Sequence, residues 1–320
     1  GLRNTEFNYS QIYTVKLQTR VPATIDVCAG AAKKELVVHF PVNYVEVPDA
    51  VSQAYAAERG KRRSHDSHYP NELVANLIGF SLDADGFLEW RENMTDWSVV
   101  NGVLRKGLLY EMPKEVQERI LRKLAPSAPA AVVESSDGYI VIGGRGEDFH
   151  LAGMIMPFPA GHPVYNPSDG SLEKPWKALD RKSRAELNFP LEEAERFCII
   201  GAVRGHCGSY GAWNPAIVYF IEAGLDIRQL EERHKDAPDR PENEIFLPTP
   251  ADPLYLSEFI KANVLKRDER GGHKLIDNGL GELLLYGRFR FGDLWYEQLI
   301  QELTRDPRYE TTISEGNPFK

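Results

Sequence analysis

A short loop and the charged segment after it hold the residues of this 320-residue chain whose types could do chemistry. Gly161, His162 and Pro163 are consecutive in the loop, and Arg181 and Glu186 follow in the charged segment. Carboxylate oxygens are the ligands that Mg²⁺ prefers, whereas guanidinium and imidazolium groups hydrogen-bond to phosphate oxygens. We therefore expect the ligand site here, with Gly161, His162 and Arg181 among the ligand-binding residues.

Lys182 and Glu186 are four residues apart, so a helix places them on the same face. The pair predicts either a salt bridge or a position where the ammonium attracts the phosphates of a ligand. Glu186 is the candidate catalytic carboxylate, and Glu186 with Glu192 is the candidate metal-binding set. An acidic run at the start of a helix is also typical of a solvated face that the helix dipole favours, which is the alternative for Glu192 and Glu193.

A second loop, residues 205–211, is rich in glycine and contains His206 beside Cys207. Its backbone N–H groups could approach an anion or a sugar, so His206 is a further candidate ligand-binding residue. The loop could equally be a plain hairpin turn. A Cys–His nucleophile is disfavoured, because adjacent residues of a strand point to opposite faces.

The elements that must position these residues follow from the hydrophobic pattern. Alternating and apolar runs predict strands, and apolar residues at helical spacing predict helices. The predicted order is a hairpin, a strand, a long irregular loop over residues 157–175, a charged helix, two strands and two C-terminal helices. The ranges are 131–134, 139–142, 151–156, 173–187, 197–203, 216–222, 251–265 and 293–303.

This order, together with Gly161-His162-Pro163 and Glu186-Leu187-Asn188-Phe189-Pro190, resembles the Nudix superfamily. The similarity is greatest to the divergent branch that acts on UDP-sugars and carries an extra N-terminal domain. It covers roughly residues 126–260. The resemblance implies a Nudix-type mixed sheet flanked by helices, and a ligand that is a small anionic nucleotide or nucleotide sugar.

The family motif ends Arg-Glu-x-x-Glu-Glu, and here Arg181 and the last glutamate, Glu186, match it. Lys182 and Ala185 stand where the family has glutamates, and none follows Pro163. The resemblance therefore implies a nucleotide-binding protein that has lost most hydrolase activity, with Mg²⁺ needed only if catalysis persists.

Two alternatives stay open beside this interpretation. One is an active pyrophosphohydrolase with non-standard carboxylates drawn from Glu173, Glu186, Glu192 and Glu193. The other is a structural or interaction domain, in which the Gly/Pro loop simply caps another kind of α+β sheet.

A proline- and alanine-rich run at residues 125–129 marks the expected boundary between two domains. Residues 1–125 are predicted to form a smaller, β-rich α+β domain. Residues 126–320 are predicted to form the Nudix-like domain with C-terminal helices. In the first domain, strands are expected at 12–17 and 35–40. Helices are expected at 44–59, within 89–109, and at 113–124.

Composition limits the partners. A net charge of −9 disfavours nucleic acid, because phosphates repel an acidic chain. No run of about 18 apolar residues suggests a membrane span. The cysteines, Cys28, Cys198 and Cys207, are odd in number, so we expect thiols and a reducing, cytoplasmic setting. The oligomeric state is left open.

Overall fold

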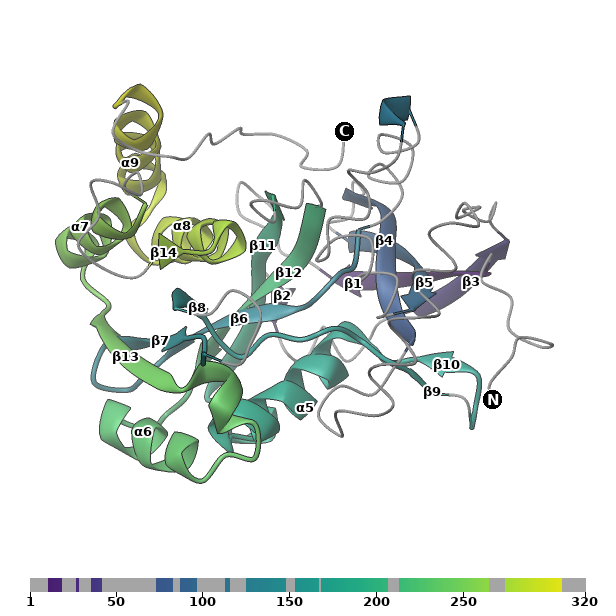
Figure 1. The fold of residues 1–320 in the computed structure, drawn as a ribbon, viewed down its shortest axis with the longest axis horizontal. Coiled ribbons are helices and arrows are strands. Elements are labelled where there is room, and N and C mark those ends of the chain that lie inside the picture. The colour runs from purple at the N-terminus through teal and green to yellow at the C-terminus, as the bar shows by residue number, and fades with distance from the viewer. Residues whose placement is uncertain are drawn as a thin grey trace.

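The chain combines helices with mixed β-sheet structure, which confirms the expected α+β class (Figure 1). The computed structural model describes residues 11–18, 27–28, 36–41, 73–82, 87–96, 113–115, 125–147, 153–166, 168–206, 213–264 and 274–306. Within these ranges, no helix is both long and apolar enough to cross a bilayer.

The N-terminal third contributes a four-stranded antiparallel sheet in the order β3-β1-β5-β4. In the range 89–109, where a helix is expected, residues 89–96 belong to strand β5, and the remainder lies outside the described residues. β5 pairs with β1 on one side and β4 on the other, and these ladder hydrogen bonds override local helix propensity. The expected helix at 44–59 and most of that at 113–124 lie outside the described residues. The strands are β1 (Gln11–Gln18), β3 (Leu36–Pro41), β4 (Leu73–Leu82) and β5 (Phe87–Asp96).

The second half is built on an eight-stranded mixed sheet in the order β14-β8-β7-β6-β12-β11-β2, with β13 paired to β7. β12 is parallel to β6 and β14 to β8, whereas the other neighbours are antiparallel. The predicted hairpin is present, and its turn ends at Gly138 with a φ of +81°. The strands are β2 (Val27–Cys28), β6 (Ala130–Glu134), β7 (Tyr139–Gly144), β8 (Met154–Pro157), β11 (Arg196–His206), β12 (Trp213–Glu222), β13 (Ile245–Pro250) and β14 (Lys274–Leu275).

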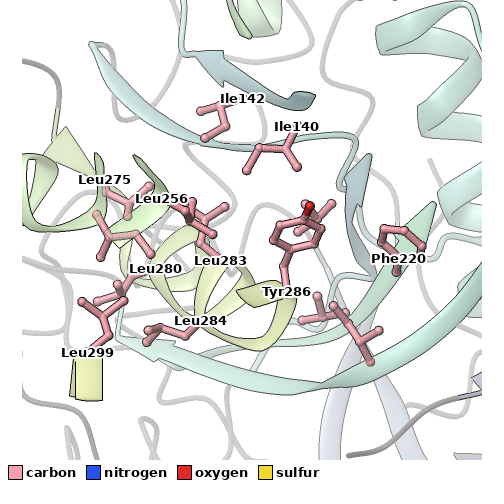
Figure 2. Packing of buried hydrophobic residues seen from close by; sticks show 14 of the residues in the cluster. Ile140, Ile142, Phe220, Leu256, Leu275, Leu280, Leu283, Leu284, Tyr286 and Leu299 are labelled. Atoms are coloured by element: carbon pink, nitrogen blue, oxygen red, sulfur yellow. The ribbon is translucent and has the colours of Figure 1, made fainter. Parts of the chain in front are cut away.

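Helices cover both faces of this sheet, and each face has its own apolar core. α5 (Pro175–Leu187) and α6 (Ile227–Lys235) pack on one face. α7 (Pro253–Asn263), α8 (Asp277–Phe291) and α9 (Asp293–Arg305) pack on the other, where Figure 2 shows the leucines of α8 against the strands.

The sequence pattern did not predict α6, β13 or α8. For α8 the reason is its glycines, which disfavour helices. They are needed for close packing: a Cβ on Gly281 would lie 2.7 Å from Cγ1 of Val203, and one on Gly287 would lie 2.0 Å from the Trp295 ring. Contact with neighbouring elements therefore outweighs local propensity in this helix.

Several backbone contacts join the N-terminal strands to the second half. Val74 of β4 forms a bridge with Val164, which follows the loop that contains Gly161, His162 and Pro163 (the glycine loop below). Asn76 forms a bridge with Pro126. β2, from the N-terminal third, pairs with β11 at the edge of the eight-stranded sheet. Through the bridge from Val74, β4 contacts the loop that carries the candidate site. The division into domains at residue 125 remains a prediction.

Candidate functional site

Helix α5 forms where local signals predict it, although it begins two residues later than expected. Pro175 occupies its first turn, where the missing N–H needs no partner. Asn188 ends it in the left-handed conformation, with φ of 51°, and donates its N–H to the Arg184 carbonyl. Leu179 and Leu187 are fully buried, and Trp176 packs partly buried against the same core.

The inward side of α5 also carries charge. The Lys182 ammonium lies 2.8 Å from Oε1 of Glu186, 2.9 Å from Oε2 of Glu242 and 3.4 Å from Oδ2 of Asp239. Nη1 of Arg145, which follows β7, lies 2.8 Å from Oε1 of Glu242. Arg145, Lys182, Glu186, Asp239 and Glu242 are called the ion-pair cluster below.

Glu186 is the most enclosed member of the ion-pair cluster, with 2% of its side chain exposed. Oε1 contacts Lys182, and Oε2 accepts a hydrogen bond of 3.2 Å from the side-chain amide of Asn243. Nδ1 of His234 lies 2.7 Å from the backbone carbonyl of Glu186 and donates to it, because a carbonyl only accepts. Both carboxylate oxygens and the backbone of Glu186 are therefore engaged.

Burial and charge act in opposite directions within the cluster. Burial raises the pKa of Glu186 to about 7, although the Lys182 ammonium lowers it. Burial also disfavours ionisation of Glu242, but Lys182 and Arg145 outweigh it and hold its pKa at about 2. Burial disfavours the charged form of Lys182 too, yet Glu186 and Glu242 raise its pKa above the usual value. Because the two glutamates share one ammonium, they titrate as a linked pair.

Gly161 is explained by its contact with Lys182. A Cβ at Gly161 would lie 2.3 Å from Cγ of Lys182 and 2.8 Å from Cδ, so only glycine lets the loop cross the lysine stem. The loop is also tied to the sheet, because the Gly161 N–H donates to the Pro129 carbonyl at 3.1 Å. The glycine that suggested a ligand loop is therefore also required by the packing of Lys182.

His162 and Arg181 connect the loop to α5. Nδ1 of His162 donates to the Ser127 carbonyl at 2.7 Å. Arg181 binds both oxygens of Glu173, with Nε at 3.1 Å and Nη2 at 2.9 Å, and Nη2 also donates to the His162 carbonyl at 2.9 Å. Such a two-pronged pairing fixes the guanidinium plane. The Arg181 side chain still exposes 42% of its surface, so part of it faces solvent.

The structure thus brings together five of the predicted site residues, and it places the others elsewhere. Glu192 is 76% exposed and pairs with Arg184 at 3.5 Å, and Glu193 pairs with Arg233 at 2.6 Å. His206 ends β11, but its side chain lies outside the described residues, as does Cys207. The five that meet are Gly161, His162, Arg181, Lys182 and Glu186.

Sequence reasoning missed Arg145, Asp239, Glu242 and Asn243. Arg145 directly follows β7, Asp239 precedes the 3₁₀ turn η5 (Arg240–Asn243), and Glu242 and Asn243 lie within η5. All four are far along the chain from α5. No spacing rule connects such positions, so only the folded chain reveals the ion-pair cluster.

The donor set of the ion-pair cluster does not fit a divalent cation such as Mg²⁺. Glu186, Glu242 and Asp239 supply the carboxylate oxygens of the ion-pair cluster, and Lys182 contacts all three. A cation placed among them would meet the ammonium. In the parts of the chain that the structure describes, no group of three or more His, Cys, Asp or Glu residues is arranged to hold a metal.

Comparisons with known proteins place few limits on function. No family model matches the chain, and no curated protein matches it. Among solved structures, it is similar to DR0079 from Deinococcus radiodurans, with a TM-score of 0.33 and 14% identity. That match covers 50% of this chain and 80% of DR0079. A similarity this low carries no argument about fold or function.

Proposed function

We propose that the second half of this chain is a Nudix-like module that binds a small nucleotide or nucleotide sugar and does not hydrolyse it with Mg²⁺. One observation carries the proposal: the Lys182 ammonium lies among Glu186, Glu242 and Asp239. Metal-dependent phosphate chemistry needs carboxylates that are available to a cation. Here the ammonium neutralises them instead.

The arrangement of elements supports the Nudix-like part of the proposal. A glycine loop precedes a helix, α5, and this loop–helix unit packs on a mixed sheet with helices on both faces (Figure 1). The loop touches the helix within the motif, where Gly161 packs against Lys182, which replaces a family glutamate, and the His162 carbonyl accepts a hydrogen bond from Arg181, which matches the motif.

Exposure separates the residues that a ligand could reach from those that it could not. The Lys182 side chain is only 12% exposed and its charge is balanced by carboxylates, so we assign it a structural role. Arg181 is 42% exposed and lies against the same loop as His162. We therefore propose that a phosphate of the ligand contacts Arg181 and His162 at the loop surface.

The same contacts argue against an active pyrophosphohydrolase with replacement carboxylates. Glu173 is occupied by Arg181, and Glu186 by Lys182 and Asn243. Glu192 is exposed beside Arg184 and does not belong to the ion-pair cluster. Recruiting these groups to one cation would require breaking several charge-assisted hydrogen bonds at once.

The test combines turnover and binding on one panel of UDP-sugars, ADP-ribose and dinucleoside polyphosphates, with Mg²⁺ or Mn²⁺. We expect no phosphate-releasing turnover, and we expect a higher melting temperature with at least one compound, because a ligand that binds only the folded state stabilises it. Arg181→Gln should weaken the binding of that compound by about tenfold or more, because one charge-assisted hydrogen bond is lost. Arg184→Gln, on the same helix and paired with Asp180, is the matched control.

Two results would overturn the proposal. Turnover that Glu186→Gln abolishes would restore the hydrolase hypothesis. Absence of any thermal or calorimetric response to the whole panel would favour the structural or interaction role instead.

A further inference from the structure

Two cysteines that are distant in sequence occupy opposite positions of adjacent strands. Cys28 is in β2 and Cys198 is in β11, and the antiparallel register pairs Cys198 with Cys28 and Ile199 with Val27. β2 is the edge strand of the eight-stranded sheet and contains only two residues. Cys198 is fully buried and present as a thiol that forms no disulfide.

The backbone register alone meets the distance requirement of a disulfide. Directly opposite residues of antiparallel strands have Cα atoms about 4.5 or 5.5 Å apart, depending on the hydrogen-bonding position. Disulfides span Cα distances of about 4.4–6.8 Å. Opposite residues also lie on the same face of a sheet. Neither strand would have to change register for the bond to form.

We propose that Cys28 and Cys198 form a reversible cross-strand disulfide when the protein meets a small-molecule disulfide such as oxidised glutathione. One cysteine thiolate attacks the glutathione disulfide, forming a mixed disulfide and releasing one glutathione thiolate. The second cysteine thiolate then attacks the protein sulfur of the mixed disulfide and releases the second glutathione. Two protein thiols are oxidised and one glutathione disulfide is reduced to two thiols.

The bond would change how the N-terminal third is held. Within the described residues, β2 reaches the eight-stranded sheet through a ladder of only two residue pairs. A disulfide would make this attachment covalent and close a long loop, which restricts the unfolded chain and raises the melting temperature. Because Cys198 is buried, exchange requires β2 to separate transiently from β11. The reduced protein would therefore have a releasable edge strand and the oxidised protein a fixed one.

The test treats the full chain with oxidised glutathione, blocks remaining thiols with an alkylating agent and maps peptides without reduction. We expect a linked peptide containing Cys28 and Cys198 and an intact mass lower by two hydrogens. We also expect a higher melting temperature, and dithiothreitol should reverse all three changes. Cys207→Ser, the matched control, should behave like the wild type, whereas Cys28→Ser should yield only a mixed disulfide with glutathione.

Cys198→Ser carries the risk of disturbing a buried position, so Cys28→Ser at the sheet edge is the variant that decides. Alkylation of both Cys28 and Cys198 after prolonged oxidation of the wild type would overturn the proposal. A linked peptide that contains Cys207 in place of either residue would overturn it equally.

Discussion

Two buried glutamates, Glu186 and Glu282, lie on opposite faces of the eight-stranded sheet and have different surroundings. On the α5 face, Glu186 contacts the Lys182 ammonium at 2.8 Å and the Asn243 amide at 3.2 Å. On the α8 face, Glu282 is 0% exposed, and neither of its carboxyl oxygens has a hydrogen-bond partner among the residues that the structure describes. Its neighbours along the helix, Leu283 and Leu284, belong to the apolar core seen in Figure 2.

The difference shows how the state of a buried carboxyl group depends on the partners around it. An ionised carboxylate buried without a partner costs several kcal/mol, so the group keeps its proton instead. Burial raises the pKa of Glu282 well above its usual value, which favours the protonated, uncharged form of the side chain. For Glu186, burial raises the pKa of the carboxyl group, whereas the Lys182 ammonium lowers it. On the α8 side, Tyr286 and Arg290 donate hydrogen bonds to the buried Glu134, so that carboxylate is compensated as Glu186 is. Glu282 differs from both because it lies among apolar side chains of the core.

The largest expected effect comes from removing the compensating charge. Lys182→Met leaves Glu186, Glu242 and Asp239 without their shared ammonium. We expect a loss of about 3–5 kcal/mol in the free energy of unfolding, because a broken buried ion pair leaves an uncompensated charge. Urea denaturation at pH 7 measures it. Lys177→Met, on the exposed side of the same helix, should cost under about 1 kcal/mol.

Equal losses in the free energy of unfolding for Lys182→Met and Lys177→Met would contradict the contrast between Glu186 and Glu282. They would show that the α5 face tolerates an unpaired glutamate as well as the α8 face does.

The next effect tests whether the loop holds Lys182 in place. Gly161→Ala puts a methyl group 2.3 Å from the Lys182 Cγ position, so the lysine or the loop must move. We expect a loss of about 1–3 kcal/mol, the usual range for overpacking. The same urea series gives the value. An unchanged free energy of unfolding would mean that Lys182 moves aside without losing its carboxylates.

On the α8 face, we expect a substitution to increase the free energy of unfolding instead of lowering it. Glu282→Leu removes a buried carboxyl group that has no hydrogen-bond partner in the described part of the chain, and it leaves an apolar side chain of similar size. We expect a gain of about 1–2 kcal/mol at pH 7.5, the desolvation cost of one unsatisfied group. Glu297→Leu on α9, which is exposed, should change stability by about 0.5 kcal/mol or less. A destabilised Glu282→Leu protein would mean that this carboxyl group has a structural role after all.

The smallest effect is the pH dependence of that gain. The folded pKa of Glu282 is raised above 4.5, so its contribution to stability is fully present below pH 4.5. Above that pH the unfolded chain ionises first, and stability falls as the pH rises towards the folded pKa. The advantage of Glu282→Leu should therefore grow between pH 5 and pH 8. Melting temperatures of both proteins across this range check the sign, and a constant difference would contradict it.

Sequence pattern alone predicted much of the site's framework. Helix α5 was predicted because its apolar spacing, its starting proline and the residues at its end are local signals. The hairpin at residues 130–144 was predicted for the same reason. The salt bridge between Lys182 and Glu186 was one of two interpretations of their four-residue spacing, and the structure contains it.

What sequence pattern missed depends on contacts between distant residues. β5 was assigned in part to a helix, because its pairing with β1 and β4 leaves no local mark. α8 was missed because its glycines are explained only by the side chains packed against them.

The sequence by itself determined the local elements and the helical pair, since these follow from spacing and from capping residues. Only the tertiary structure decided that Lys182 would be surrounded by carboxylates. Arg145 and Glu242 are 97 residues apart, and Lys182 and Glu242 are 60 apart. Such pairs form because folding the sheet brings β7 and η5 next to α5, and burial then makes their mutual neutralisation strongly favourable. The physical reason is that charge compensation depends on distance in space, which spacing along the chain does not encode beyond one or two helical turns.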